Sequence, residues 1–240
     1  MNKPLVIQGL SKSFDDKKVI DNISLDVDAC ETFILLGPNG AGKTTTIKLI
    51  TGLLAPDNGK ITIAGYDVNT NPEEAKAKVG LVPDVPFLYD NLSGREFIFF
   101  TGKLRRMSVN QIAGRIEDLN KFLDFGLWFD QKCGGYSHGM KQRVMIAQAL
   151  LHDPKLLLID EPMVGLDPRA MLKVVGLINQ AKQKGSGVLI STHLIPLAET
   201  LADRLAIIDA GRLRFIGSRS EFAGEIEKIY LSVTYAQSDI

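Results

Sequence analysis

The chain has 240 residues, of which 45% are apolar and 23% charged, as in ordinary globular proteins. This length is enough for one large domain or two closely packed subdomains. The 28 Lys and Arg residues balance the 28 Asp and Glu residues, which argues against a broad nucleic-acid-binding face and predicts no nucleic acid partner. No run of about 18 apolar residues occurs, so we expect no membrane-spanning helix.

The first part of the chain predicts strands around a glycine-rich loop. Apolar runs predict strands at residues 5–7, 23–27, 33–36 and 60–65. A helix is expected at residues 44–54, where turn-forming residues end it. From residue 93 to about residue 151 the pattern becomes helical, with helices expected at residues 95–106, 109–125 and 141–151.

Strands and helices alternate again in the last part of the chain. Strands are expected at residues 156–160, 188–192 and 205–209, helices at 169–184 and 195–201, and a closing hairpin strand at 212–217. The alternation predicts an α/β fold with a mainly parallel sheet and helices on its faces. The helix-rich segment that interrupts it suggests an inserted helical subdomain.

Eight consecutive residues match the phosphate-binding pattern GxxxxGK[ST]. They are Gly37, Pro38, Asn39, Gly40, Ala41, Gly42, Lys43 and Thr44. They lie between a predicted strand and a predicted helix, which is the context that this loop requires. Backbone N–H groups and the helix N-terminus would bind phosphate oxygens, and Lys43 would reach the β- and γ-phosphates. The Thr44 hydroxyl would ligate Mg²⁺, and we include Thr45 in the predicted nucleotide site.

Two adjacent carboxylates follow the apolar strand at residues 156–160. Asp160 would lie at the carboxyl end of a buried strand, beside the phosphate loop, where it can hold Mg²⁺ through a water. Glu161 is expected to point elsewhere, because side chains alternate along a strand. It is the natural general base for the attacking water. Alone, such a pair could be a simple strand-end turn, but after a phosphate loop the catalytic interpretation is favoured.

Tyr136-Ser137-His138-Gly139-Met140 stands between these two motifs. With the phosphate loop and the Asp160–Glu161 pair, in this order and spacing, the chain resembles the ATP-binding subunit of an ABC transporter over nearly its whole length. The resemblance implies a P-loop NTPase (RecA-like) fold with an N-terminal antiparallel β subdomain and an inserted α-helical subdomain. It implies one ATP-binding domain, whose core with the β subdomain is residues 1–85 and 152–225. Residues 86–151 would form the helical subdomain with the signature motif, and residues 226–240 a C-terminal tail.

The resemblance assigns Ser137 and Gly139 to the family's LSGGQ signature. They would hold the γ-phosphate of ATP bound to a second ATP-binding subunit, in a head-to-tail dimer that we expect to be a homodimer. The alternative is an ordinary helix N-cap at Ser137, and both can be true together. Tyr136, His138 and Met140 depart from the pattern, and this form is similar to the exporter branch of the family.

Four further residues gain roles only from the resemblance. Asp167 matches the D-loop aspartate that reaches across the dimer, and His193 matches the switch histidine that contacts the γ-phosphate. Phe14 lies where the family stacks an aromatic ring on adenine, although it could equally be a core residue of a hairpin. Asp84 stands where the family usually has Gln, contacting Mg²⁺ and the attacking water.

The chain is therefore expected to be an ATP-hydrolysing energy subunit that uses ATP and Mg²⁺ and drives a polytopic membrane permease, and export is the expected direction of transport. The permease would dock near Val85 to Phe100, where large apolar residues gather; the alternative is that these residues fill the helical core. We expect a cytoplasmic protein, peripheral on the cytoplasmic face of the cell membrane. Other functions considered are a soluble ABC ATPase acting on ribosomes or DNA, and a nucleotide-dependent kinase.

Overall fold

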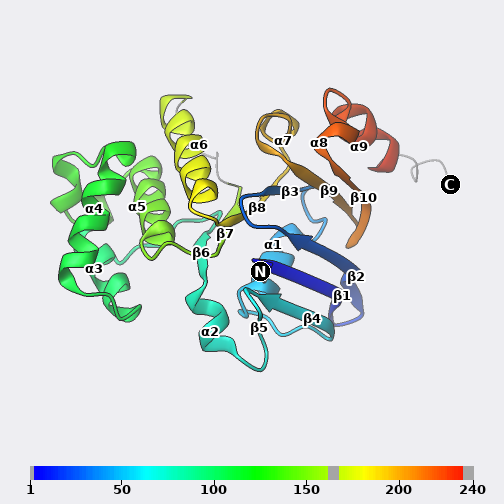
Figure 1. Cartoon of the computed structure of the whole chain (residues 1–240), viewed down its shortest axis with the longest axis horizontal. Coiled ribbons are helices and arrows are strands. Elements are labelled where there is room, and N and C mark those ends of the chain that lie inside the picture. Colours follow the sequence, from blue (N-terminus) through cyan, green and yellow to red (C-terminus); the bar gives the residue numbers. More distant parts are fainter. Residues whose placement is uncertain (1–2, 162–167, 235–240) are drawn as a thin grey trace.

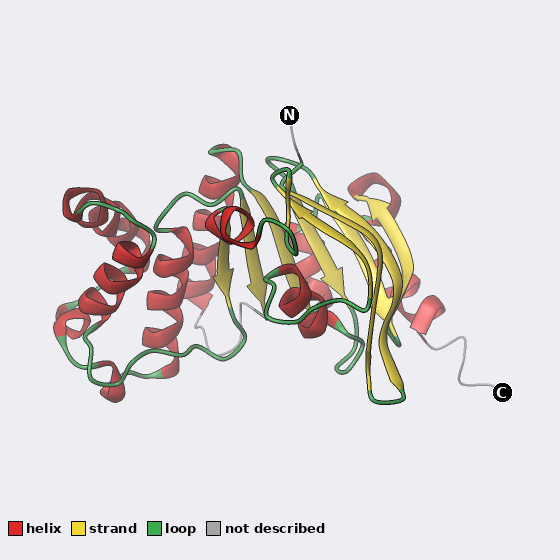
Figure 2. Cartoon of the chain, turned by 90° about the horizontal axis from the view of Figure 1, so that it is seen from below, coloured by secondary structure: helices red, strands yellow, loops and turns green. Residues whose placement is uncertain are grey.

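The computed structural model describes residues 3–161 and 168–234. It contains two sheets and a group of helices at one end of the molecule (Figure 1). The first sheet has four strands in the order β2-β1-β4-β5, and the second has six in the order β10-β9-β3-β8-β7-β6. Figure 2 shows the strands gathered at the centre and on one side, with helices packed around them.

The four-stranded sheet is antiparallel and comes from the N-terminal part of the chain. Its strands are β1 (Leu5–Phe14), β2 (Lys17–Val27), β4 (Asn58–Ile63) and β5 (Tyr66–Asp67). The β1 strand pairs with both β2 and β4. This is the predicted antiparallel β subdomain.

The six-stranded sheet is parallel except at its β10 edge. Its strands are β3 (Thr32–Leu36), β6 (Val79–Val82), β7 (Leu156–Asp160), β8 (Gly187–Thr192), β9 (Arg204–Asp209) and β10 (Arg212–Ser218). Every residue of β3, β7 and β8 is buried, because both faces of a parallel sheet are covered. The predicted α/β P-loop fold class is confirmed.

Alternating side chains of β3 enter two different apolar cores. Ile34 and Leu36 pack into the core that contains the helical region, whereas Phe33 and Leu35 pack against the antiparallel sheet. Strand side chains point to opposite faces in turn, so one buried strand joins the two cores. The phosphate loop that follows β3 is therefore anchored from both sides.

Helices surround the parallel sheet and carry its connections. They are α1 (Lys43–Ile50), α2 (Pro72–Ala77), α6 (Pro168–Gln183), α7 (Ile195–Leu201), α8 (Arg219–Phe222) and α9 (Ile226–Thr234). Within the two described ranges, no helix combines the length and apolar character needed to cross a bilayer.

Three longer helices form the helical region between β6 and β7. They are α3 (Gly94–Leu104), α4 (Val109–Leu123) and α5 (His138–Leu150), with short 3-10 turns η1 (Leu127–Asp130) and η2 (Cys133–Gly135) before α5. Ser93 with Glu96, and Ser108 with Gln111, form capping boxes that fix where α3 and α4 begin. Figure 1 shows these helices together beside α6.

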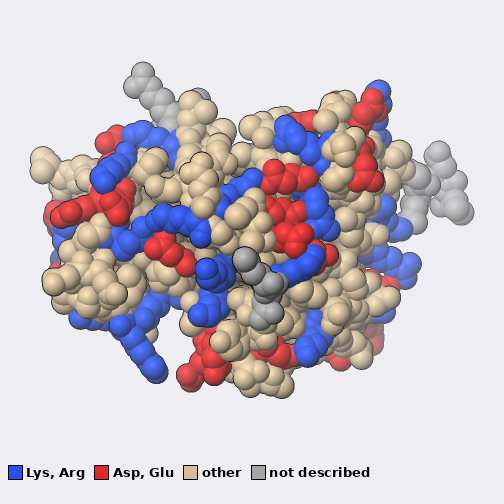
Figure 3. Space-filling model, viewed as in Figure 1, with Lys and Arg blue, Asp and Glu red and all other residues tan. Residues whose placement is uncertain are grey.

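Sequence patterns missed the short elements β5, β6, α2, α8 and α9 and the two 3-10 turns. The β6 strand has only four residues and includes Gly80, where a Cβ would lie 2.1 Å from the Ala149 carbonyl oxygen of α5. That close approach explains a glycine in a strand, and it hides the strand from an apolar-pattern search. Positive and negative side chains are interleaved across the face in Figure 3, as expected from the balanced composition.

Candidate nucleotide-binding site

The glycine-rich loop connects β3 to the N-terminus of α1. Gly37 donates its N–H to the Thr192 carbonyl oxygen over 3.2 Å, which attaches the loop to the end of β8. Gly40 and Gly42 have φ angles of 80° and 109°. A Cβ at Gly42 would lie 2.6 Å from Ile20 Cδ1, and one at Gly37 would lie 2.3 Å from the Ile208 carbonyl oxygen. Backbone conformation and close packing together require glycine here.

Lys43 is the buried cation of this loop. Its side chain is 6% exposed, and its Nζ donates to the Gly37 and Pro38 carbonyl oxygens over 2.8 and 3.1 Å. Nζ also lies 3.6 Å from Glu161 Oε1. Burial lowers the pKa of Lys43, while the nearby Glu161 and Asp160 carboxylates oppose that shift.

Asp160 and Glu161 occupy different surroundings at the end of β7. Asp160 is 3% exposed and accepts a short hydrogen bond from the Ser191 hydroxyl of β8. Glu161 has a φ angle of 49° and lies just beyond the strand. Its carboxylate accepts from Thr192 Oγ1 at 3.2 Å and lies 3.0 Å from His193 Nδ1. The turn after β7, rather than alternation within the strand, therefore directs Glu161 toward Lys43 and His193.

Asp84 follows β6 and belongs to the same electrostatic environment. Desolvation by the surrounding protein raises the pKa of Asp84, the Asp160 and Glu161 carboxylates raise it further, and His138 and His193 act in the opposite direction. The structure therefore brings Asp84 into electrostatic range of both carboxylates that end β7. Because the Asp84 side chain is exposed, it is accessible to a ligand at this edge of the sheet.

The residues predicted to hold Mg²⁺ fit a metal shared with a bound nucleotide. Thr44 is exposed and Thr45 half-buried, both at the N-terminal turn of α1. Among residues 3–161 and 168–234, no group of three or more His, Cys, Asp or Glu side chains could hold a metal ion by itself. Protein-bound Mg²⁺ commonly uses one or two carboxylates together with phosphates and waters, so the oxygen donors of Thr44 and Asp160 are of a type compatible with it.

The signature residues lie at the beginning of α5. Ser137 is the N-cap, and its Oγ accepts from the Met140 N–H over 3.3 Å. The prediction that Ser137 is a helix N-cap is therefore confirmed. Ser137 and His138 are also exposed. Gly139 follows in the first helical turn, where N–H groups lack partners within the helix. A helix N-terminus beside an exposed hydroxyl is a favourable environment for an anion.

Two further predicted site residues are Phe14 and Asp167. Phe14 is 42% exposed at the tip of the β1–β2 hairpin, with Lys12 Nζ 5.6 Å from its ring centre. It is thus not a residue of the hairpin core, and its ring is available for stacking. Asp167 lies outside the described residues.

Sequence reasoning missed two hydroxyl residues of the site, Ser191 and Thr192. They bind the Asp160 and Glu161 carboxylates respectively. A signal was present, because Ser191 and Thr192 directly precede His193 at the carboxyl end of a buried strand. Only the neighbouring register of β7 and β8, with Asp160 opposite Ser191, shows which carboxylate each one meets.

Comparisons with known proteins agree with this geometry. A family model described as ABC transporter matches residues 20–164. A second model, described as AAA domain, putative AbiEii toxin, Type IV TA system, matches residues 133–198. Both matched ranges include residues 136–140 and the Asp160–Glu161 pair.

Curated relatives cover most of the chain. The Linearmycin resistance ATP-binding protein LnrL of Bacillus subtilis is 34% identical over 92% of this chain and 71% of the relative. A Nod factor export ATP-binding protein I of Burkholderia lata is 37% identical over 95% of this chain and 76% of the relative. ABC transporter ATP-binding protein NatA of Bacillus subtilis is 34% identical over 95% of this chain and 97% of the relative.

A solved structure described as the ATP binding subunit of an ABC transporter has the same fold. It is 33% identical, covers 95% of this chain and 98% of its own, and superposes with a TM-score of 0.89. The family model's match, residues 20–164, spans the phosphate loop, the Asp160–Glu161 pair and residues 136–140. The chain therefore belongs to the ABC transporter family and is an ATP-binding subunit. The ATP-binding subunits of this family are ATPases that power transport.

Proposed function

We propose that two copies of this chain bind two MgATP head to tail and power a membrane exporter from the cytoplasmic face of the membrane. The observation that carries the proposal is the position of Glu161, held between Lys43 and His193 at the carboxyl ends of β7 and β8. Ligands in this fold bind outside the carboxyl ends of the strands. A carboxylate fixed there beside the phosphate-binding Lys is suited to activate a water for attack on phosphorus.

Residues of the loop and of the strand ends would have separate roles in ATP hydrolysis. Lys43 would exchange its bonds to the loop carbonyls for the β- and γ-phosphates, and the loop N–H groups would bind phosphate oxygens. Mg²⁺, held by Thr44 and Asp160, would neutralise negative charge on the phosphates. Glu161 would accept the proton of the attacking water, while His193 and Asp84 would orient the water and the γ-phosphate.

The signature supports a head-to-tail dimer. Ser137 and Gly139 present a helix N-terminus with an exposed hydroxyl, which is a favourable environment for a phosphate. We assign them to the γ-phosphate of the partner's ATP, together with Asp167. Phe14 would stack on adenine, and identical chains could form both sites because each chain carries every motif.

The docking surface proposed for the permease is an aromatic cluster in the segment before α3 and on α3 itself. Val85, Phe87, Tyr89 and Phe100 are 74%, 68%, 48% and 43% exposed. The Tyr89 ring lies 5.7 Å from Phe87 and 5.9 Å from Phe100, edge to face in both cases. Leu88, Phe97 and Ile98 are instead buried, so residues 85–100 contribute both to the helical core and to an exposed apolar patch of the kind that marks an interface.

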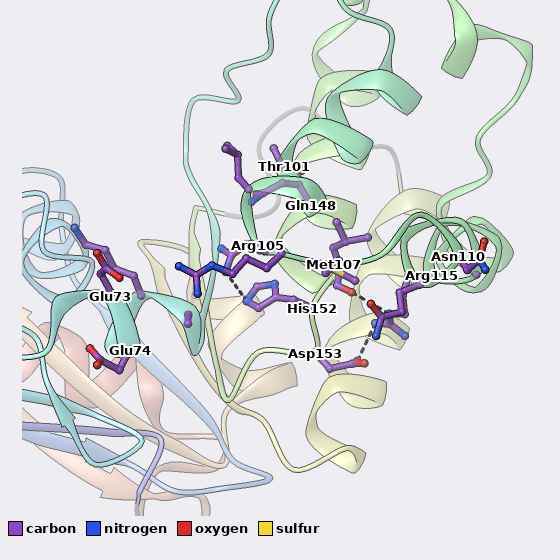
Figure 4. Close-up of a pocket in the computed structure, with 17 residues that line it drawn as sticks. Glu73, Glu74, Thr101, Arg105, Met107, Asn110, Arg115, Gln148, His152 and Asp153 are labelled. Atoms are coloured by element: carbon purple, nitrogen blue, oxygen red, sulfur yellow. Dashed lines mark hydrogen bonds and ion pairs between the residues drawn. The ribbon is translucent and has the colours of Figure 1, made fainter.

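A groove continues this patch along α3. Leu104, one turn after Phe100, is 69% exposed and lines a groove of about 1280 Å³ between α2 and the ends of α3, α4 and α5. Figure 4 shows Arg105 and His152 lying together in its wall. Arg105 Nη1 lies 2.9 Å from His152 Nε2, and Nη2 donates to the Val79 carbonyl oxygen over 3.1 Å. The groove is thus a fixed recess in which we expect a protruding segment of the permease to lie.

The direction of transport is supported by the relatives. Two of them are named for linearmycin resistance and Nod factor export, so export is the direction that we propose for this chain. None of the comparisons named above favours action on ribosomes or DNA, or a kinase activity.

Capture of the partner tests the proposal. A tagged Glu161→Gln chain, which should bind ATP but hardly hydrolyse it, is isolated with MgATP from detergent-solubilised membranes. We expect a polytopic membrane protein, which Phe87→Ser should release and Leu127→Ser should not, because Leu127 is 93% exposed but lies outside the docking surface. Capture of ribosomal proteins or DNA without a membrane protein, or equal capture by both variants, would contradict the proposal.

A further inference from the structure

The segment before the signature is hydrogen-bonded to the residues that directly precede α3. Cys133 donates its N–H to the Leu92 carbonyl oxygen over 2.8 Å, and Gly134 donates to Asp90 over 3.2 Å. An isolated antiparallel bridge also joins Ser93 to Lys132. Hydrogen bonds therefore join two segments that lie about 40 residues apart in sequence.

The Tyr136 hydroxyl joins these segments through a buried side chain. It accepts from the Gly94 N–H over 2.9 Å and lies 3.1 Å from the carbonyl oxygens of both Phe129 and Gln131. Its single proton can be donated to one of these carbonyls at a time. Tyr136 is only 7% exposed, so water does not readily replace these bonds.

Side chains pack closely around the hydroxyl. A Cβ at Gly94 would lie 2.7 Å from the Phe129 ring and 2.9 Å from the Tyr136 hydroxyl. The Trp128 ring lies 5.1 Å from the Tyr136 ring and perpendicular to it. Such a close-packed joint transmits displacement instead of absorbing it.

The two sides of this joint carry different functions. The next residue after Tyr136 is Ser137, the exposed N-cap of α5. On the other side, α3 begins at Gly94 and carries Phe97 and Phe100, whose rings lie 6.1 and 5.9 Å from the Tyr89 ring. One hydroxyl thus stands between the proposed docking surface and the signature serine.

We propose that the Tyr136 hydroxyl is a positioning group that couples permease docking on α3 to the placement of Ser137 at the partner's ATP. This inference rests on the proposed function, because it requires docking at the aromatic cluster. Tyr136 itself touches no phosphate; it acts by holding Ser137 in a fixed relation to the docking end of α3. A displacement of that end by the permease is then carried directly to the signature.

The test compares Tyr136→Phe with the wild type in the complex with the permease that co-purifies with this chain. Tyr66→Phe is the matched control, because Tyr66 is partly exposed on β5, in the antiparallel sheet. We expect Tyr136→Phe to bind the permease and to keep the KM for ATP. The stimulation of kcat by the permease should fall at least about fivefold, the lower end of typical coupling between sites.

Two further measurements address the case in which the variant folds poorly. In Tyr136→Phe, emission of Trp128, the single tryptophan of the chain, reports whether the packing around residue 136 survives the substitution. In the wild type, permease docking should change amide hydrogen exchange both at residues 87–100 and at residues 129–140. A change confined to the first segment would overturn the inference.

Other outcomes of the enzymatic test separate this inference from the function on which it rests. Stimulation of Tyr136→Phe equal to that of the wild type would overturn the coupling role and leave the proposed function intact. Loss of permease binding by Tyr136→Phe would show that the hydroxyl only supports the docking surface, which also overturns it. If the wild-type chain itself assembles with no membrane protein, the proposed function fails and the inference fails with it.

Discussion

Glu161 Oε1 lies 3.0 Å from His193 Nδ1 and 3.6 Å from Lys43 Nζ. Three separate parts of the chain supply this cluster: the turn after β7, the end of β8 and the first residue of α1. The carboxylate is thereby held next to the Lys that is expected to bind phosphate. This arrangement is the structural basis for assigning the general base to Glu161.

Glu161→Gln should abolish most of the hydrolysis without preventing nucleotide binding. The amide keeps the shape of the side chain but cannot accept the proton of water, so we expect kcat to fall by about 10²- to 10⁴-fold. Glu117→Gln on the exposed face of α4 is the control and should leave kcat unchanged. Steady-state phosphate release measures kcat, and binding of a fluorescent ATP analogue checks the site. A Glu161→Gln chain with normal turnover would remove Glu161 from the mechanism.

Substitution by alanine should have opposite effects on the free energy of unfolding at two glycines with different backbone conformations. Gly42→Ala forces φ near 109° on a residue with a Cβ and places that Cβ too close to Ile20. We therefore expect the free energy of unfolding to fall by about 1–3 kcal/mol or more. ATP binding should be lost as well. Gly114→Ala lies within α4 with nothing within 4 Å of the new Cβ. It should gain about 0.5–1 kcal/mol. Urea unfolding of both variants measures the changes, and equal effects would contradict this account of the loop.

Tyr136→Phe should also destabilise the isolated chain. The substitution keeps the ring but leaves the buried Gly94 N–H without its acceptor, which costs about 1–3 kcal/mol of unfolding free energy. Tyr66→Phe removes a hydroxyl from a partly exposed ring and should change the stability by less than about 0.5 kcal/mol. Denaturant titration of the two variants provides the comparison. A Tyr136→Phe chain as stable as the wild type would show that the hydroxyl bonds contribute little.

His152 should make the stability of the fold depend on pH. Burial and the adjacent Arg105 guanidinium lower the pKa of His152 to about 4 from its usual value near 6.5. The unfolded chain therefore binds a proton that the folded chain does not, and stability is lost as the pH falls from about 6.5 toward 4. The total loss from this group is about 3 kcal/mol.

His152→Gln isolates this effect, because glutamine can still accept from Arg105 but does not titrate. We expect the melting temperature of the variant to fall less steeply than that of the wild type between pH 6.5 and 4. Scanning calorimetry across that range measures the difference. Parallel pH profiles for the two proteins would mean that His152 is protonated equally easily in the folded and unfolded states.

The parts of the site that the sequence could predict are those in which chemistry and local structure are contiguous. The strand, loop and helix around Lys43 form one uninterrupted segment, and Asp160 ends a run of apolar residues. Both signals are visible without knowing what packs against them. The same holds for the order of strands and helices that predicted the α/β fold.

Contacts between distant segments could not be read from the sequence. The bond between Tyr136 and Gly94 joins residues 42 positions apart, and the bonds of Ser191 and Thr192 to Asp160 and Glu161 span 31. Local patterns carry no information on such pairings. The direction of Glu161 also depends on a backbone conformation with φ of 49°, which side-chain alternation along a strand does not describe.

The pairing of two chains around MgATP is the central claim, and native mass spectrometry tests it most directly. With MgATP, the Glu161→Gln chain should appear as a dimer that holds two nucleotides. Adding Ser137→Ala should shift it to a monomer with one nucleotide, because we propose that the signature hydroxyl contacts the partner's ATP. A nucleotide-bound monomer with Ser137 intact, or a dimer that persists unchanged without the Ser137 hydroxyl, would contradict the account.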